Sequence, residues 1–197
     1  MTNQFDNIFS DDNIFEDSPA AKKTIHLKDG ERRNVSILFA DIHGFTKLSE
    51  KLDHEVVQSL IDKLMSLFTN SVEKFGGYVD KYSGDEIMAL FGAKVASEVD
   101  TSRSIFCGLE LLSILEKFNK YILNEPKFSK YDINFEMRIG INTGMVTTGK
   151  VGKKREGDFT VYGDAVNLAS RMESNAPIGQ IMVNKRTKRL VENIIEF

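Results

Sequence analysis

The chain has 197 residues, of which 41% are hydrophobic and 28% are charged, and these are ordinary values for one globular domain. Its 26 lysine and arginine residues against 29 acidic residues give a net charge of −3, which argues against a strongly basic nucleic-acid-binding protein. The single cysteine excludes a disulfide framework and a cysteine-based zinc cage. No apolar run reaches the roughly 18 residues of a membrane-spanning helix, and the N-terminus shows no secretory signal, so a cytoplasmic protein is expected.

The first 24 residues are polar, acidic at their start and weakly self-similar, with the runs FDNIF and DDNIF. Such a segment cannot bury enough apolar surface to offset the entropy lost on ordering, so it is predicted to be a tail or linker. A short docking motif built on its phenylalanine and isoleucine side chains is the alternative. The folded domain is expected over residues 25–197.

A strand and a long helix are predicted first. The run 34–40 (NVSILFA) is short, apolar and rich in β-branched residues, which favours a buried strand that ends at Asp41. Apolar residues at spacings of three and four then predict a helix that starts near Asp53, a suitable N-cap residue. The glycines at 76–77 are typical of a helix end.

A hairpin and a second helix are predicted next. Residues 78–92 contain two β-rich arms around Ser83-Gly84, a pattern typical of a tight hairpin. Residues 100–124 carry an apolar stripe at helical spacing, with Leu109 among its members, and Pro126 follows the end of this segment.

The last third of the chain predicts further strands and helices. Residues 132–142 alternate strictly between apolar and polar, which predicts a half-buried strand, and 144–149 suggest another short strand pair. A strand leading into a helix is expected over 160–171, then a strand over 181–184 and a helix over 185–193. The whole order predicts an α+β fold with a ferredoxin-like or palm βαββαβ core, in which helices pack on a mainly antiparallel sheet.

Two aspartates stand where a metal site could form. Asp41 ends a predicted strand, and Asp85 lies at the tip of the predicted hairpin. If the hairpin pairs beside that strand, the two carboxylates converge, and paired oxygen ligands suit Mg²⁺. The alternative is that both aspartates are ordinary turn or cap residues.

Two further patterns could bind a nucleotide. Gly44 and Thr46 follow Asp41 in the loop IHGFT, where backbone amides and a hydroxyl near a helix start could hold a phosphate, although no Walker motif is present. Asn167 and Arg171 are four residues apart and so share one face of a predicted helix. An ordinary polar surface is the alternative for this second pair.

Four segments together resemble the signature blocks of the class III nucleotidyl cyclases, the catalytic domain of adenylate and guanylate cyclases. They are FADIHGFT, KYSGDEIMALFG, RIGINTG and TVYGDAVNLASRM, and they stand in the family's order from about residue 31 to the C-terminus. The resemblance implies an adenylate cyclase, in which the ribose 3′-oxygen of ATP attacks the α-phosphate with the help of two Mg²⁺ or Mn²⁺ ions. The products would be cyclic AMP and pyrophosphate.

The resemblance also implies roles for single residues. The metal-binding positions of the family correspond to Asp41, Asp85 and the carbonyl of Ile42. Asn167 corresponds to the residue that orients the ribose, and Arg171 to the one that stabilises the transition state.

The triphosphate-binding loop of the family corresponds to Gly44, Phe45 and Thr46. Arg155, in a basic loop, falls where the family places a further triphosphate contact, and a solvated loop is the alternative.

The base-recognition positions of the family correspond to Lys81 and Thr160. Lysine only donates hydrogen bonds and threonine can accept one, which fits the N1 acceptor and amino donor of adenine. Guanylate cyclases of the family carry an acidic residue and a cysteine at these places. The commonest adenylate cyclase choice at the second position is aspartate, and the threonine-bearing branch includes bicarbonate-responsive enzymes, so activation by bicarbonate is a hypothesis.

In this family the site is shared across a dimer, and this chain carries both halves, so a homodimer with two equivalent sites is expected. The family usually continues into a final hairpin that bears a triphosphate-binding lysine, and the expectation is either that this domain lacks the hairpin or that the sequence is a piece of a longer chain. Three alternatives therefore stand beside adenylate cyclase: a weak or silent nucleotide-binding or dimerisation module of the same fold, a guanylate cyclase, and a diguanylate cyclase. The last is disfavoured because Ser83 replaces a glycine of its GGDEF hairpin.

Overall fold

The computed structural model describes residues 30–43, 52–126, 128, 133–151 and 158–197. The strands are β1 (Arg32–His43), β2 (Tyr78–Ser83), β3 (Glu86–Phe91), β4 (Glu136–Val151), β5 (Asp158–Tyr162) and β6 (Ile181–Val183). The helices are α3 (His54–Lys74), α4 (Asp100–Asn124), α5 (Asp164–Asn175) and α6 (Lys185–Val191). This order confirms the predicted α+β class and its βαββαβ core.

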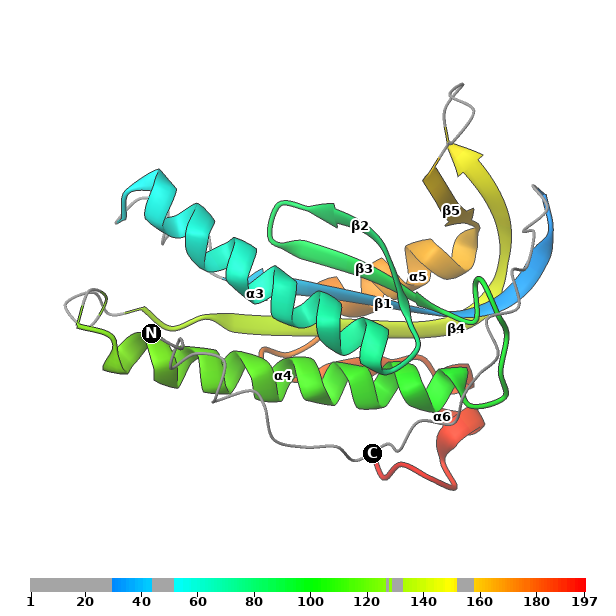
Figure 1. Cartoon of the computed structure of the whole chain (residues 1–197). Helices are drawn as coiled ribbons and strands as arrows, with labels where there is room; N and C mark the ends of the chain where they lie inside the picture. The colour runs from blue at the N-terminus through cyan, green and yellow to red at the C-terminus, as the bar shows by residue number, and fades with distance from the viewer. Residues whose placement is uncertain (1–29, 44–51, 127, 129–132, 152–157) are drawn as a thin grey trace.

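One sheet organises the molecule (Figure 1). Its strands run in the order β2-β3-β1-β4-β5 with antiparallel neighbours, and β6 pairs with β4 in parallel. The long strands β1 and β4 form its middle. None of the helices in the described ranges is both long and apolar enough to cross a membrane.

The central strand β1 is buried on both faces, which explains why its sequence is a continuous apolar run. Leu38, Ala40 and Ile42 point to a core shared with α3 and α4. Ile37 and Phe39 point to a second core, which is shared with α5 and β5. The sheet therefore lies between α3 and α4 on one face and α5 on the other.

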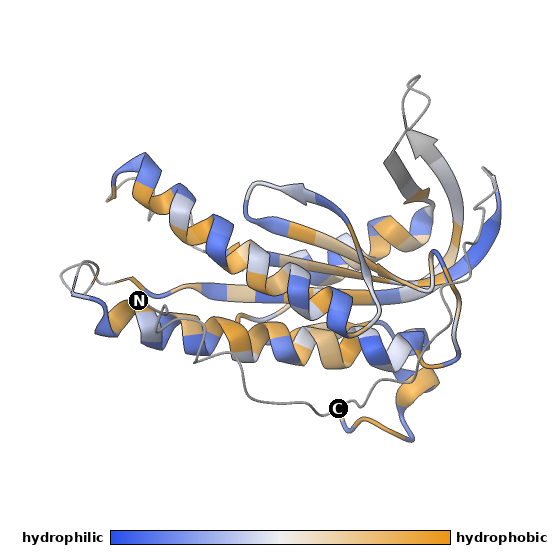
Figure 2. Cartoon of the chain, in the orientation of Figure 1, coloured by the Kyte–Doolittle hydropathy of each residue, from blue (hydrophilic) through white to orange (hydrophobic). Residues whose placement is uncertain are grey.

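Helices α3 and α4 are amphipathic, and Figure 2 shows apolar and polar residues alternating along both. Helix α3 ends where Gly76 adopts a φ of +73°, a left-handed conformation that glycine adopts without steric cost. One member of the predicted stripe on α4 is wrong, because the side chain of Leu109 is 48% exposed.

Two predicted boundaries are corrected by the structure. The segment 144–149 is no separate strand pair but part of the single 16-residue strand β4. Gly144 sits inside this strand because α5 passes close by: a Cβ there would lie 2.9 Å from the Cβ of Ala165. The turn of the β2–β3 hairpin falls at Gly84 and Asp85, one residue later than predicted, with Gly84 at a φ of +66°.

Helix α5 lies almost directly on the backbone of β4. A Cβ added to Gly140 would lie 2.0 Å from the backbone nitrogen of Glu173 and 2.5 Å from the carbonyl oxygen of Ala169. Only glycine permits such an approach. The consequence is that α5, which carries Asn167 and Arg171, is held against the middle of the sheet.

Candidate functional site

The β2–β3 turn brings Asp85 to the end of β1, beside Asp41. The residue after Asp85, Glu86, is the register partner of Asp41 across β1 and β3. The backbone N–H of Ile42 donates to the carbonyl oxygen of Asp85 at 3.3 Å. Burial raises the pKa of Asp85, a backbone hydrogen bond lowers it, and the charge of Asp41 raises it further. The hairpin therefore pairs beside β1, which is the condition on which the predicted convergence of the two carboxylates depends.

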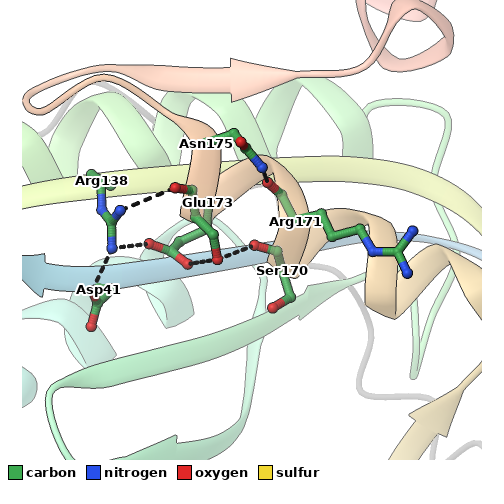
Figure 3. Close-up of polar contacts among 7 residues, drawn as sticks. Asp41, Arg138, Ser170, Arg171, Glu173 and Asn175 are labelled. Atoms are coloured by element: carbon green, nitrogen blue, oxygen red, sulfur yellow. Dashed lines mark hydrogen bonds and ion pairs between the residues drawn. The ribbon is translucent and has the colours of Figure 1, made fainter.

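An arginine that the sequence reasoning missed lies against Asp41. In Figure 3, the guanidinium of Arg138 stands between the carboxylates of Asp41 and Glu173, with Nη2 at 3.2 Å from an oxygen of each. Its Nη1 also donates to the backbone carbonyl of Ser174 at 3.1 Å. Arg138 showed only as a polar position of an alternating strand, and the β1–β4 register, which pairs it with Asp41, could not be deduced from the sequence.

Acidic groups outnumber the arginine at this point. Glu173 is 3% exposed, and burial raises its pKa, while a hydrogen bond from Ser174 and the charge of Arg138 lower it. Burial also raises the pKa of Glu86, and the charges of Glu173 and Asp41 add to that effect. The end of β1 is therefore a region of crowded negative charge that a cation would stabilise.

The residues present fit a magnesium-type site. Among the described residues, no three side chains of His, Cys, Asp or Glu converge as a complete ligand set. Two neighbouring carboxylates and a strand backbone are therefore what the protein offers here. Mg²⁺ is commonly held by one or two carboxylates and completes its shell with water and substrate phosphates.

Helix α5 presents Asn167 and Arg171 away from its buried side. Ala165, Ala169 and Glu173, spaced by four residues, are its buried members, whereas Asn167 and Arg171 are exposed. Figure 3 shows the side chain of Arg171 extending away from Asp41 and Arg138. The chain therefore does not direct its own Arg171 toward its own Asp41.

The two predicted base-recognition residues lie on strands at opposite ends of the sheet order. Lys81 is in β2 and Thr160 is in β5. The fold nevertheless brings these strands together, because the hydroxyl of Thr160 donates to a carboxylate oxygen of Asp80 at 2.8 Å. Asp80 directly precedes Lys81, so the backbone of Lys81 lies one residue from this contact. No pattern in the sequence indicated the contact between Asp80 and Thr160, which are 80 residues apart.

Four predicted site residues lie outside the described residues. They are Gly44, Phe45 and Thr46 of the predicted phosphate loop, and Arg155 of the basic loop. Their roles stay predictions.

Comparison with known proteins agrees with this arrangement. The family model described as the adenylate and guanylate cyclase catalytic domain matches residues 27–197. An adenylate cyclase of Anabaena cylindrica is 32% identical over 157 residues, which are 79% of this chain. Among solved structures, the adenylyl cyclase CyaB of P. aeruginosa is 30% identical with a TM-score of 0.77, and the match covers 86% of this chain and 85% of that one. The guanylyl cyclase Cya2 is 33% identical with a TM-score of 0.75, over 83% and 80% of the two chains.

The similarity therefore includes enzymes of both base specificities at comparable identity. The match spans only 30% of the length of the Anabaena protein, so it concerns a domain of that enzyme. The family model covers residues 27–197 of the present sequence. On this evidence the chain belongs to the family of adenylate and guanylate cyclase catalytic domains.

Proposed function

We propose that this domain is an adenylate cyclase that converts ATP into 3′,5′-cyclic AMP and pyrophosphate. The observation that supports this choice of base is the hydrogen bond of the Thr160 hydroxyl to Asp80, the residue directly before Lys81. Lys81 has donors only, so it suits the N1 acceptor of adenine and opposes the N1–H donor of guanine. Binding of the base would bury the exposed Lys81 donors, and a buried donor without an acceptor costs about 1–3 kcal/mol, which would favour ATP over GTP.

The reaction is a displacement at the α-phosphorus. The ribose 3′-oxygen forms a new bond to this phosphorus, the bond to the oxygen that bridges to the β-phosphate breaks, and the hydroxyl proton passes to solvent. Asp41 and Asp85 would hold divalent cations beneath the phosphates, with the Ile42 carbonyl as a further ligand. Bound there, two such ions would acidify the 3′-hydroxyl and balance the charge on the leaving pyrophosphate.

The exposed face of α5 would serve the same reaction. Asn167 would orient the ribose, and Arg171 would meet the negative charge that grows on the α-phosphate, a preorganised electrostatic effect. Gly44, Phe45, Thr46 and Arg155 would hold the triphosphate. This chemistry asks for no nucleophilic side chain.

A homodimer would complete the site. Because Arg171 extends away from Asp41 within one chain, a second copy is needed to bring the two together. A two-fold arrangement would pair the aspartates of one subunit with Lys81, Thr160, Asn167 and Arg171 of the other, and so form two equivalent sites.

The test is product identification. The purified chain is incubated with ATP or GTP and with Mg²⁺ or Mn²⁺, and the cyclic product is separated by chromatography. Cyclic AMP is expected from the wild type, with turnover lower by at least about 100-fold in Asp41→Asn and Asp85→Asn. Glu116→Gln, which removes an exposed carboxylate from α4, is the matched control and keeps its activity. Cyclic GMP as the main product would contradict the choice of base, and a folded chain that forms neither product would favour the silent nucleotide-binding module.

Metal binding has a separate readout. Because a ligand that binds only the folded state stabilises it, Mn²⁺ should raise the melting temperature of the wild type. The same addition should leave the melting temperature of Asp85→Asn unchanged. Equal shifts in both proteins would place the bound ion elsewhere.

A further inference from the structure

We propose that Asp80 is a specificity-determining residue, which acts by fixing the direction of the Thr160 hydroxyl. The inference rests on the proposed function, because it concerns how the base of the substrate is selected. It adds a residue to the site that lies outside the predicted set and touches Thr160 rather than the base itself.

The first step is the direction of one hydrogen bond. The Thr160 hydroxyl donates to Oδ2 of Asp80 at 2.8 Å. An ionised carboxylate has acceptors only, so the single hydrogen of the hydroxyl is committed to Asp80. Two lone pairs of the Thr160 oxygen remain, and both can only accept. The pair Asp80–Thr160 therefore presents an acceptor to a ligand, although a free threonine could present either kind of group.

The second step is the local backbone. Val79 pairs with Ala89, and Lys81 pairs with Met88, which directly precedes Ala89 in β3. Asp80 is therefore the extra residue of a β-bulge. A bulge breaks the strict alternation of side chains and re-aims one of them. The burial pattern of β2 shows the lost alternation, since its first three residues are all half-buried and its last three all exposed. The bulge at Asp80 frees its side chain from the regular alternation of β2, and this side chain contacts Thr160 of β5.

The third step is the match to purines. Adenine carries an exocyclic amino group, which donates, at the position where guanine and hypoxanthine carry a carbonyl oxygen, which accepts. An oxygen that can only accept a hydrogen bond binds the amino group of adenine and repels the carbonyl oxygen of guanine or hypoxanthine. Asp80 thereby makes the Thr160 hydroxyl, which could otherwise donate or accept, an acceptor that selects purines with a 6-amino group.

The experiment compares ATP with inosine triphosphate, which differs from ATP at the 6-position and at N1 and lacks the 2-amino group of GTP. The ratio of kcat/KM for the two substrates is measured in the wild type, Asp80→Asn, Thr160→Val and the double variant. An asparagine amide can donate to Thr160 and release its hydrogen toward the base, so Asp80→Asn should lower the ratio about tenfold. Glu116→Gln, with the same loss of charge on α4, should leave the ratio unchanged.

The Thr160→Val background separates the proposed role from a structural one. Without the hydroxyl, Asp80→Asn should have no further effect on the ratio. A fall of equal size in both backgrounds would mean that Asp80 acts through Lys81 or through the fold, and would overturn the inference. An unchanged ratio in Asp80→Asn alone would overturn it as well.

A binding measurement keeps this result apart from the proposed function. The 3′-deoxy forms of both nucleotides lack the attacking hydroxyl, so their affinities can be compared by calorimetry whether or not the domain turns over. A wild type that forms no cyclic product but binds 3′-deoxy-ATP better than 3′-deoxy-ITP, with the preference lost in Asp80→Asn, would support the inference while the proposed activity fails. Equal preference in the wild type and Asp80→Asn would overturn the inference even if the wild type makes cyclic AMP.

Discussion

Arg138 of β4 connects its strand with β1 and α5. Its guanidinium lies 3.2 Å from both Asp41 on β1 and Glu173 on α5. Glu173 is 3% exposed, so its charge has little water to stabilise it. Removing the cation from such a cluster leaves buried negative charge without compensation.

We therefore expect Arg138→Met to lower the free energy of unfolding at pH 7 by about 1–3 kcal/mol, as measured by urea denaturation. Because burial raises the pKa of Glu173, this carboxyl stabilises the fold when protonated and loses that contribution as the pH rises through its folded pKa. The penalty of Arg138→Met should thus shrink toward pH 4, and Glu173→Gln should restore much of the loss at pH 7. A penalty independent of both pH and Glu173 would contradict the electrostatic account.

Cys107 offers a second test at a single residue. Its side chain is fully buried, and burial raises the pKa of the thiol from 9.0 to about 12, although the neighbouring Ser71 side chain opposes the shift. The thiol of the unfolded chain ionises above pH 9, whereas that of the folded chain does not, so stability is lost as the pH rises from 9 toward 12. The wild type should lose up to about 1.4 kcal/mol per pH unit more than Cys107→Ala in this window. Equal slopes in urea denaturation would show that the thiol is not shielded.

At the scale of elements, the contact between α5 and β4 positions the face of the helix that carries Asn167 and Arg171. Gly140 has no room for a side chain, because the atoms in the way belong to the backbone of α5. Gly140→Ala should destabilise the fold by about 1–3 kcal/mol and displace α5. A displacement of about 1 Å at Asn167 and Arg171 can reduce turnover by roughly 100-fold. Denaturation and cyclase assays measure the two effects.

Gly108→Ala is the matched control for that substitution. A Cβ at Gly108 would lie 2.9 Å from Cδ1 of Ile181, the movable end of a side chain, and alanine favours the helix in which it sits. This variant should keep both stability and activity. Loss of activity in both variants to the same extent would mean that the close approach of α5 at Gly140 has no special role.

At the scale of the whole molecule, the proposed site requires two chains. A chain with Asp41→Ala lacks the metal half of the site, and a chain with Lys81→Ala lacks the base half. Each should be inactive alone, because both of its sites are defective. In a mixed dimer one of the two sites is intact, so mixing should restore activity, up to about one quarter of the wild type if chains pair at random. Mixing without any rescue, with chain exchange shown by differently tagged subunits, would refute the shared site.

The helices and strands followed from local patterns. The apolar run 34–40 and the alternation over 132–142 predicted strands β1 and β4, and the periodic stripes predicted α3 and α4. One mistake arose because a glycine in a strand can have either of two causes. Gly144 suggested a break between strands, but its lack of a side chain accommodates α5, and this cause becomes visible only when the two elements are packed together.

The sequence by itself determined the elements, the family and the nature of the residues at the predicted site, because periodicity, turn-forming residues and motif order are all local properties of the chain. Tertiary structure alone decided that Arg138 meets Asp41 and Glu173, that Arg171 extends away from them, and that Asp80 lies on Thr160. These contacts depend on strand register, on one bulge and on the curvature of the sheet. Each of these is set by the packing of residues many positions apart, about which a local pattern carries no information.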